Sequence, residues 1–363
     1  MNEERTNQLN RIVIKGFKSI AECDLDLNDI NVLIGANGAG KSNFISAFEM
    51  LKKILSRELA LYTGKKGGAG TLLYNGKKVT DSITMEFTIA ENIYGFELEA
   101  TENDGLIFRE ERFESPSSLW GEGGHAEAML SDAIRDSSVG LMDTEDWLLE
   151  PFSVYQFHDT SPSSRIKSES NISNSVRLIS DARNLAAFLY RLKQSFPKEY
   201  NNILRAIQLV APFFDDFELE PKELNEEQII LKWKKKGCED VFNAAQFSDG
   251  TLRFICLATL LLQPTELQPS TIIIDEPELG LHPFAITILA EMVQKAAVNK
   301  QVILATQSVE LLDNFEAEDV IVVDNAENGS EFKRLNEEQL KLWLDNDYTL
   351  GELWSKNIFG GRP

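Results

Sequence analysis

The strongest constraint on the fold is a glycine-rich stretch, "GANGAGKS", that runs from Gly35 to Ser42. It follows the spacing Gly-x4-Gly-Lys-Ser, and the apolar run "INVLI" directly before it favours a β-strand. Behind it, apolar residues recur at helical spacing from Phe44 to Leu55, so a helix is expected to begin near Gly40. A strand, a glycine turn and a helix in this order predict a loop whose backbone N–H groups bind phosphate.

The residue types in this loop suit a nucleotide triphosphate and a magnesium ion. Gly35, Gly38 and Gly40 let the backbone curl around an anion. Lys41 is expected to reach the β- and γ-phosphates, and the Ser42 hydroxyl to bind Mg²⁺. A glycine turn without a ligand is the alternative, which the flanking strand and helix disfavour. The predicted cofactors are therefore ATP and Mg²⁺, and the predicted nucleotide-binding residues of the loop are Gly35, Ala36, Asn37, Gly38, Ala39, Gly40, Lys41, Ser42 and Asn43.

Two further apolar runs end in polar side chains. "STIIIDEPELGLHP" leads into Asp275 and Glu276, and "QVILATQS" leads into Gln307. Ligands of parallel sheets bind at the carboxyl ends of the strands. Asp275 is therefore expected to hold Mg²⁺, Glu276 to orient or deprotonate the attacking water, and a polar residue after the second run to face the γ-phosphate. A strand end followed by an acidic helix cap is the alternative reading.

The rest of the chain indicates an α/β protein. Alternating polarity from Ser82 to Phe113 predicts a meander of antiparallel strands. The stretch from Ser115 to Asp146 is rich in Ser, Gly and acidic residues and is expected to be irregular. A helical region with a break near Pro197 is predicted from Arg183 to Val210, and a short strand from Ile229 to Trp233. After Pro269, strands alternate with helices, which implies a parallel sheet.

The charge of the chain disfavours a general affinity for nucleic acid. Lys plus Arg is 36 and Asp plus Glu is 58, which gives a net charge of −22 in 363 residues. An acidic chain repels phosphate backbones, so DNA contact would need a local basic patch. The candidates are Lys65–Lys66, Lys77–Lys78 and Lys232–Lys236. Each of these also suits a solvated loop or strand edge.

Composition also bounds the compartment. Apolar residues make up 43% of the chain, as in ordinary globular proteins. Cys23, Cys238 and Cys256 have no metal or disulfide spacing. No signal core is visible at the N-terminus, and no apolar run is long enough to span a bilayer. A cytoplasmic protein without direct membrane insertion is therefore expected.

The stretch "FSDGTLRF" makes the interpretation more specific. Ser248 can cap the apolar helix that follows, and the exposed N–H groups of the helix start form an anion site that Gly250 leaves accessible. The order of phosphate loop, Ser-Asp-Gly-Thr turn, "IIIDEPELGLHP" and "ATQS" resembles the ABC-type ATPases, in the branch of RecF-like, SMC-like and OLD-like proteins. The opening "RIVIKGFKSI" and the closing "WLDNDYTLGELWSKNIFGGRP" also resemble this branch and a bacterial group of predicted stand-alone AAA-family ATPases.

This resemblance implies a fold. It is a P-loop NTPase head of ABC type with a mixed or parallel core sheet, an antiparallel β subdomain and a helical lobe, without a coiled-coil arm or nuclease domain. One domain, 1–363, is expected. Its segments are the P-loop and antiparallel β subdomain (1–115), an irregular insertion (116–180), the helical lobe with the signature motif (181–265), and the Walker B strand, switch strand and tail (266–363).

The resemblance also implies roles for single residues. Ser248 and Gly250 would receive the γ-phosphate of ATP held by another subunit, in a homodimer with two sandwiched nucleotides. Asp275 matches the Walker B aspartate and Glu276 the catalytic glutamate. Gln307 stands where ABC proteins usually have a histidine, and glutamine can donate a hydrogen bond but cannot carry charge. Hydrolysis is therefore expected to be slow.

Two assignments complete the predicted site. Gln156 is chosen as the Q-loop residue that helps to hold the metal, with His158 and Asp159 as alternatives. Lys18, just after the first predicted strand, is expected to approach the nucleotide.

The function expected from the resemblance is an ATP-driven dimerising switch that acts on DNA or on an effector protein, in DNA repair or phage defence. A transporter ATPase subunit and a non-hydrolysing ATP sensor are the alternatives.

Overall fold

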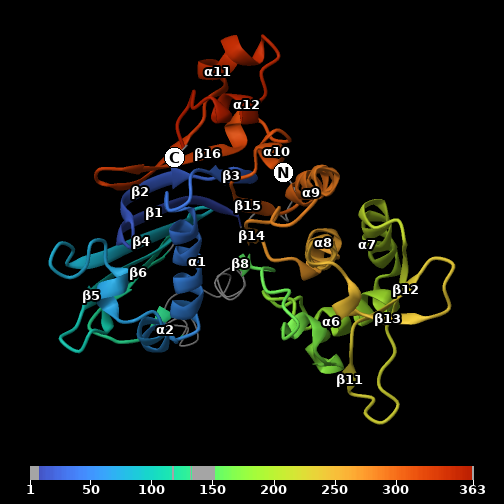
Figure 1. Cartoon of the computed structure of the whole chain (residues 1–363). Helices are drawn as coiled ribbons and strands as arrows, with labels where there is room; N and C mark the ends of the chain where they lie inside the picture. The colour runs from blue at the N-terminus through green and yellow to red at the C-terminus, as the bar shows by residue number, and fades with distance from the viewer. Residues whose placement is uncertain (1–7, 117, 131, 133–151, 362–363) are drawn as a thin grey trace. The chain divides into compact units, whose positions relative to one another are not determined.

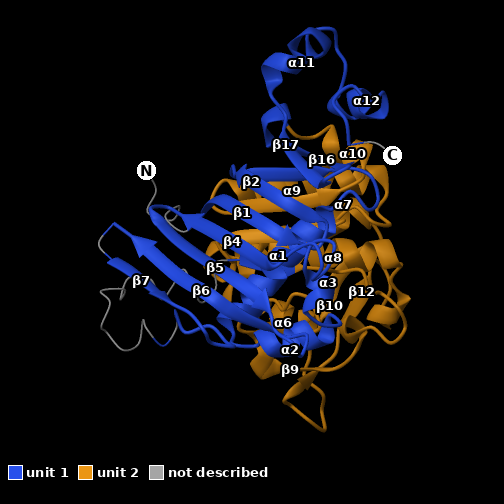
Figure 2. Ribbon diagram, turned by 90° about the vertical axis from the view of Figure 1, so that its left-hand side faces the viewer, with its two compact units in different colours: residues 1–154, 316–363 blue, residues 155–315 orange. Residues whose placement is uncertain are grey.

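The computed structural model of the chain describes residues 8–116, 118–130, 132 and 152–361 (Figure 1). The chain forms two compact units, one of Met1–Val154 with Glu316–Pro363 and one of Tyr155–Phe315 (Figure 2). These units divide the sequence differently from the four segments expected above, because the chain leaves the first unit after Val154 and returns to it at Glu316.

The first unit contains a six-stranded antiparallel sheet in the order β2-β1-β4-β5-β6-β7. The predicted meander is confirmed, and along β4 buried residues alternate with half-buried ones, as the sequence pattern requires. The strands are β1 (Leu9–Phe17), β2 (Ile20–Asp26), β4 (Ser82–Ile89), β5 (Asn92–Ala100), β6 (Leu106–Ser115) and β7 (Ser118–Glu122).

Two features of this sheet differ from the sequence-based expectation. β7 lies within the stretch expected to be irregular, so that prediction is wrong at Ser118–Glu122, while 133–146 lie outside the described residues. In β6, Glu110 pairs with Glu97 but Phe108 pairs with Leu98, so Arg109 is an extra residue in a β-bulge. The bulge shifts the alternation by one residue and turns Glu111 to the buried face.

A second group of strands in this unit carries the phosphate loop. β3 (Ile30–Ile34) pairs in parallel with β16 (Val320–Ala326), which pairs antiparallel with β17 (Gly329–Arg334). The loop after β3 leads into α1 (Lys41–Leu55), the predicted helix. The Phe44 ring lies 5.3 Å from that of Phe332 and the Phe48 ring 6.1 Å from that of Phe87, so α1 packs against both β17 and β4. The other helices that the structure describes in this unit are α2 (Leu59–Lys65), α3 (Ala69–Leu72), α11 (Glu337–Leu344) and α12 (Leu350–Ser355).

The second unit has a parallel strand pair as its centre. β14 (Thr271–Asp275) and β15 (Gln301–Thr306) pair in parallel, from Thr271 opposite Gln301 to Asp275 opposite Ala305, which confirms the predicted parallel arrangement. α9 (Pro283–Ala297) connects the two strands, and both strands are buried except at Asp275. The remaining helices are α6 (Leu185–Ser195), α7 (Pro197–Val210), α8 (Asp249–Leu262) and α10 (Val309–Leu312); β8 (Phe152–Tyr155) spans the change from one unit to the other in sequence.

Two small sheets complete this unit. β10 (Phe214–Glu218), β12 (Lys232–Lys235) and β13 (Val241–Asn243) form one, and β9 (Ser170–Asn171) and β11 (Gln228–Ile229) form the other. The single strand predicted from Ile229 to Trp233 is therefore wrong: its two ends belong to different sheets. Trp233 anchors β12, since its ring stacks on Phe247 at 4.5 Å and on Phe242 at 4.8 Å.

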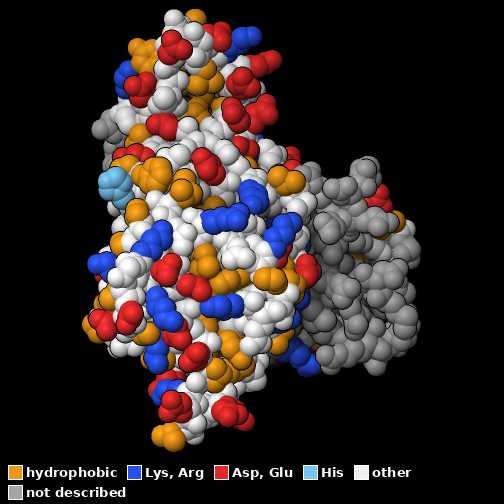
Figure 3. All heavy atoms as spheres, turned by 90° about the vertical axis from the view of Figure 1, so that its right-hand side faces the viewer, with side chains coloured by type: hydrophobic (Ala, Val, Ile, Leu, Met, Phe, Trp, Pro, Cys, Tyr) orange, Lys and Arg blue, Asp and Glu red, His pale blue; other side chains and the backbone are white. Residues whose placement is uncertain are grey.

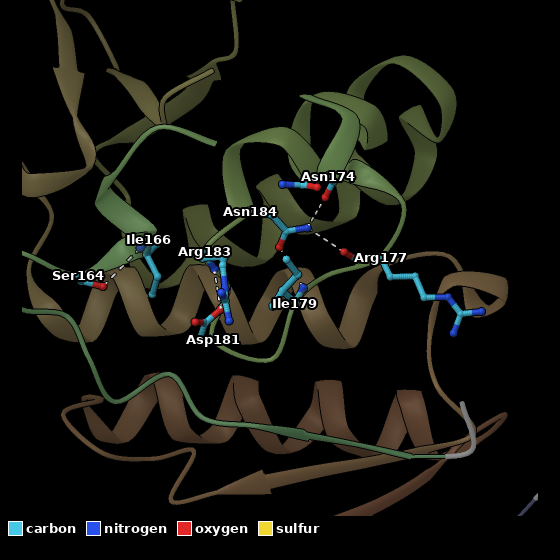
Figure 4. Close-up of polar contacts among 8 residues, drawn as sticks. All are labelled: Ser164, Ile166, Asn174, Arg177, Ile179, Asp181, Arg183 and Asn184. Carbon is cyan, nitrogen blue, oxygen red and sulfur yellow. Dashed lines mark hydrogen bonds and ion pairs between the residues drawn. The ribbon is translucent and has the colours of Figure 1, made fainter. Parts of the chain in front are cut away.

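The segment 174–184, just before α6, is held by hydrogen bonds from a side chain to the main chain (Figure 4). The fully buried Asn184 accepts a hydrogen bond from the Ile179 N–H at 2.9 Å. Its amide donates to the carbonyl oxygens of Asn174 at 2.6 Å and Arg177 at 2.8 Å. The side-chain amide of Asn184 thus fixes the path of the main chain before α6. The sequence pattern of polar and apolar residues shows no sign of this.

The described helices are short. α1 and α9, the longest of them, have 15 residues each, so the described part of the chain contains no coiled-coil arm. None of the described helices has both the length and the apolarity that crossing a bilayer requires.

Candidate functional site

The phosphate loop owes its shape to three glycines with different surroundings. Gly38 and Gly40 have φ values of 81° and 120°, in the region that favours glycine. A Cβ on Gly40 would lie 2.1 Å from the Ser330 Oγ, and one on Gly35 would lie 2.2 Å from the Val323 carbonyl oxygen. A Cβ on Gly38 would meet nothing within 4 Å. Packing therefore requires two of the glycines, while Gly38 lies at the open turn of the loop.

Lys41 lies across the loop. Its side chain is buried, and its Nζ donates to the carbonyl oxygens of Gly35 at 2.6 Å and Ala36 at 3.0 Å. α1 begins at this residue, and its N-cap, Gly40, provides no side-chain hydrogen bond. The first N–H groups of α1, its positive helix end and the ammonium together fit a chain of phosphates. The exposed Ser42 hydroxyl in the same turn is an oxygen donor that suits Mg²⁺.

A second lysine contacts the same helix. The Lys18 Nζ donates to the Ser46 Oγ at 2.7 Å, one turn beyond Ser42, and lies 5.3 Å from the centre of the Phe17 ring. Burial lowers the pKa of Lys18 to about 8. The structure thus brings Lys18 to the helix that follows the loop, which supports its predicted role near the nucleotide.

Two serines beside the loop were missed by the sequence reasoning. The amide of Asn43, a predicted nucleotide ligand, donates to the Ser19 Oγ at 2.7 Å. The Ser330 hydroxyl donates to the same Ser19 oxygen, also at 2.7 Å. The turn after β1 and the start of β17 therefore both support the first turn of α1. Ser19 follows Lys18 directly in "FKSI", which is the sequence signal that was available.

In the second unit, Gln307 lies beside Glu276, the predicted catalytic glutamate. The Gln307 Nε2 donates to the Glu276 Oε1 at 2.7 Å, so the two predicted catalytic residues are in contact. The Glu276 N–H donates to the carbonyl oxygen of Ala305 in β15 at 2.8 Å. An amide can hold a carboxylate in place without taking up its charge.

Glu278 is a further acidic residue of this cluster that was not singled out as a site residue. Its Oε1 accepts from the Gln307 N–H at 3.2 Å. Burial raises the pKa of the Glu278 carboxyl. Glu278 therefore fixes the main chain of Gln307, whose side chain holds Glu276.

Ser248 caps α8, as predicted. Its Oγ accepts from the Thr251 N–H at 3.2 Å, and the two hydroxyls lie 2.8 Å apart. The body of α8 is buried, which explains its apolar sequence. Glycine at position 250 was predicted to leave access for phosphate. Packing also requires it, because a Cβ there would lie 2.2 Å from the Gly280 carbonyl oxygen.

The three Q-loop candidates differ in their contacts. The Gln156 residue is exposed, and its N–H donates to the Ser180 carbonyl oxygen at 3.1 Å. The His158 Nε2 lies within hydrogen-bond distance, 2.9 Å, of the Asp275 carbonyl oxygen. Asp159 accepts hydrogen bonds from Ser161, which lower the pKa of the Asp159 carboxyl. The contact of His158 with the Walker B position strengthens this alternative, while metal binding by Gln156 stays a prediction.

The three candidate basic patches carry acidic partners. Figure 3 shows Lys and Arg side chains interspersed with Asp and Glu on the face that it presents. In each candidate patch, one lysine forms an ion pair with a carboxylate. This favours the interpretation of the patches as solvated surface rather than as a binding groove for nucleic acid. The pairs are Lys66–Glu49, Lys77–Asp104 and Lys234–Glu218.

Comparison with solved structures identifies the fold. An Smc head bound to the C-winged helix domain of ScpA matches with a TM-score of 0.57 and 17% identity, covering 92% of this chain and 99% of that one. An Smc head with an extended coiled coil from Pyrococcus furiosus, bound to the C-terminal domain of ScpA, gives a TM-score of 0.57 and 16% identity, with 93% and 99% covered. An Smc head with a coiled coil and joint from Pyrococcus yayanosii gives 0.55 and 12%, with the same coverage. The predicted fold class, a P-loop NTPase head of ABC type, is thereby confirmed.

Comparison at the sequence level identifies the family. No curated protein sequence matches the chain. The model of the AAA_21 family, described as "AAA domain, putative AbiEii toxin, Type IV TA system", matches residues 30–313, a range that includes every predicted site residue except Lys18. The chain therefore belongs to the AAA_21 family, and its fold is that of an SMC-like, ABC-type ATPase head.

Proposed function

We propose that this protein binds ATP with Mg²⁺, that two copies close around two nucleotides, and that slow hydrolysis reopens the dimer. The phosphate loop carries the proposal. Lys41 is buried across the loop carbonyls, and α1 begins without a side-chain cap, a combination that suits a polyphosphate. Family and fold support a nucleotide as the ligand.

The residues of the chain divide the work of binding and hydrolysis. The loop from Gly35 to Asn43 holds the phosphates, with Lys18 as a second positive charge at α1. The Ser42 hydroxyl, the Asp275 carboxylate and the Gln156 amide are assigned to Mg²⁺, which neutralises charge on the phosphates when bound. Glu276 orients or deprotonates the attacking water.

The contact between Gln307 and Glu276 supports slow hydrolysis. The Gln307 amide donates to the Glu276 carboxylate at 2.7 Å and holds the base in one orientation. A base that is already oriented needs no rearrangement before it acts on the attacking water, so this contact favours hydrolysis. Gln307 cannot become positively charged, however, so it stabilises the charge that develops on the γ-phosphate less than a protonated histidine would.

The Ser248 turn supports closure of a homodimer. Its N–H groups lie at the start of a buried helix, and Gly250 has no side chain, so a phosphate presented by a second copy would find an anion site there. We assign this contact to the γ-phosphate of the partner's ATP.

The output of the switch is assigned to a partner protein in phage defence or DNA repair, with DNA as the alternative. The acidic partner of one lysine in each candidate basic patch favours a protein over DNA. Two of the similar Smc heads are bound to a domain of ScpA, and the family description names a toxin of a type IV TA system, which also supports a protein partner.

One specific observation favours a second candidate, an ATP sensor without turnover. It is Gln307 in the position of the usual histidine. A phosphate-release assay separates the two functions, because the sensor would bind ATP and release no phosphate.

The test compares the wild-type protein with Glu276→Gln and with the control Glu291→Gln, which makes the same change on the exposed face of α9. ATP binding is measured by calorimetry and turnover by phosphate release. We expect all three proteins to bind ATP and only Glu276→Gln to lose turnover. A wild-type protein that does not bind ATP would refute the proposed function.

A further inference from the structure

Arg253 connects two segments that lie far from it in sequence. It is the one charged residue between Leu252 and Leu262, five positions after Ser248. Its Nη1 donates to the carbonyl oxygen of Leu279 at 2.9 Å, and its Nη2 donates to that of His158 at 3.0 Å. One guanidinium thus holds the loop after β14 and the segment around His158 against α8. This helix begins at the signature turn, Ser248–Thr251.

His158 extends this connection to the end of β14. Its Nε2 lies 2.9 Å from the Asp275 carbonyl oxygen. Because a carbonyl oxygen only accepts, the Nε2 carries the proton in this contact. His158 is therefore held twice, by its own carbonyl to Arg253 and by its ring to Asp275, the residue before Glu276.

Glycines permit this close arrangement. A Cβ on Gly250 would lie 2.2 Å from the Gly280 carbonyl oxygen, and one on Gly280 would lie 2.8 Å from the Arg253 Nη1. A side chain at Gly250 would push the turn and the loop apart, and one at Gly280 would displace the Arg253 guanidinium. These contacts tie the turn at Ser248–Thr251 to the loop from Glu276 to His282.

Arg253 lies beside a small cavity at the end of β14, and its guanidinium donates to main-chain carbonyl oxygens. The cavity beside it has a volume of about 10 Å³, which is room for one water molecule. Its lining includes Phe157, His158, Arg253 and Leu279, and also Asp275 and Glu276, the residues assigned to Mg²⁺ and to the attacking water. Arg253 thus contacts protein carbonyls, and any effect on hydrolysis acts through the segments that it holds.

We propose that Arg253 is a positioning residue that couples the two ATP sites of the dimer. The inference rests on the proposed function. In the closed dimer, the signature turn of one subunit touches the partner's nucleotide, while Glu276 of the same subunit acts on its own. Arg253 joins this turn to the main chain on both sides of Glu276, so engagement of one nucleotide orders the base for the other.

Lysine is an informative replacement. Arg253→Lys keeps the positive charge, but a single ammonium cannot reproduce the planar fork that reaches two carbonyls on separate segments. Arg191→Lys is a matched control in the same unit, because the Arg191 Nη1 also donates to two main-chain carbonyl oxygens, those of Ser175 and Val176.

Hydrogen exchange with ATPγS and Mg²⁺ tests the coupling without turnover. In the wild-type protein and in Arg191→Lys, we expect nucleotide to protect the signature segment 248–253 and also 156–160 and 276–282. In Arg253→Lys, protection at 248–253 should be unchanged, while protection at 156–160 and 276–282 should fall below that in Arg191→Lys. Equal spread of protection in Arg253→Lys and wild type overturns the inference, as does loss of the spread in both variants.

The same experiment separates the inference from the function on which it rests. Absence of protection at 248–253 in the wild-type protein would refute the trans-acting signature turn, and the coupling would fall with it. Steady-state hydrolysis gives the second readout. We expect the Hill coefficient to fall from about 2 to about 1 in Arg253→Lys, with the KM for ATP within about twofold of wild type. A coefficient of 1 in the wild-type protein contradicts the proposal.

Discussion

The starts of α1 and α8, the two proposed anion sites, are built in different ways. α1 begins at a glycine without a side-chain cap, and the next residue, Lys41, adds a buried positive charge. α8 begins at Ser248, whose hydroxyl already accepts a hydrogen bond from its own first turn. The next residue is Asp249, and the first cation along α8, Arg253, donates to two carbonyl oxygens.

The difference indicates which of the two helix N-termini can bind phosphate without a second subunit. α1 supplies its own counter-charge, so it can take phosphate from solution. α8 offers a dipole that the acidic Asp249 partly offsets, which fits the proposal that it receives a phosphate already bound by a second subunit. The comparison predicts that damage to α1 removes nucleotide binding, while damage to α8 removes only dimer closure and hydrolysis.

The largest effect is expected at α1. Lys41→Ala removes the buried ammonium, so ATP affinity should fall roughly a hundredfold, as expected for the loss of about 3 kcal/mol of charge-assisted hydrogen bonds. Calorimetry measures the affinity, and circular dichroism checks that the fold survives. Lys65→Ala, at an exposed lysine of α2, is the control. Unchanged affinity in Lys41→Ala would remove the phosphate-loop assignment.

The next effect concerns turnover. Glu276→Gln keeps the shape of the side chain and its contact with Gln307 but removes the base, so hydrolysis should fall by at least about a hundredfold. ATP binding persists, and an ATP-bound dimer should accumulate. Sedimentation with ATP and Mg²⁺ detects it. A monomer at every protein concentration would contradict the sandwich.

The comparison is sharpest at Ser248. Ser248→Arg replaces the cap with a bulky cation at α8 but leaves α1 intact, so ATP affinity should stay within about twofold while dimer closure and hydrolysis are lost. Thr349→Arg is the control, because it removes an equivalent cap from α12. Normal turnover and dimerisation in Ser248→Arg would end the claim that α8 acts on the partner's phosphate.

The smallest effect is a pH dependence at α1. The Lys18 pKa is about 8, below its ordinary value of 10.5, so the unfolded chain binds the proton between these values and the free energy of unfolding rises with pH there. Bound phosphates favour the ammonium form. ATP affinity should therefore fall as pH rises through about 8, by roughly threefold to tenfold between pH 7 and 9. Calorimetry should give a flatter profile for Lys18→Met; identical profiles would exclude Lys18 from the site.

Sequence patterns were sufficient where the cause is local. The start of α1 near Gly40 and the cap at Ser248 follow from a few neighbouring residues, and the structure confirms both. α12 was overlooked although its signal was local too, because Thr349 and Glu352 form a capping box.

Sequence patterns were insufficient where distant residues meet. Arg253 reaches His158 across 95 residues, and no periodicity reports such a contact. The same holds for the choice between Gln156 and His158, which depends on what lies beside Asp275. The bulge at Arg109 is a third case, since one extra residue reverses the faces of all later residues in β6.

The three glycines of the phosphate loop would be retained during evolution for different reasons. Gly35 and Gly40 are required because side chains there would strike Val323 and Ser330, whether or not a nucleotide is ever bound. A descendant that had abandoned ATP would still keep both for packing. Gly38 has open space around its Cα, so such a descendant would be free to replace it with Asn or Asp, which tolerate a positive φ. Across the lineage, retention of Gly38, rather than of the full motif, is the mark of continued selection for phosphate binding.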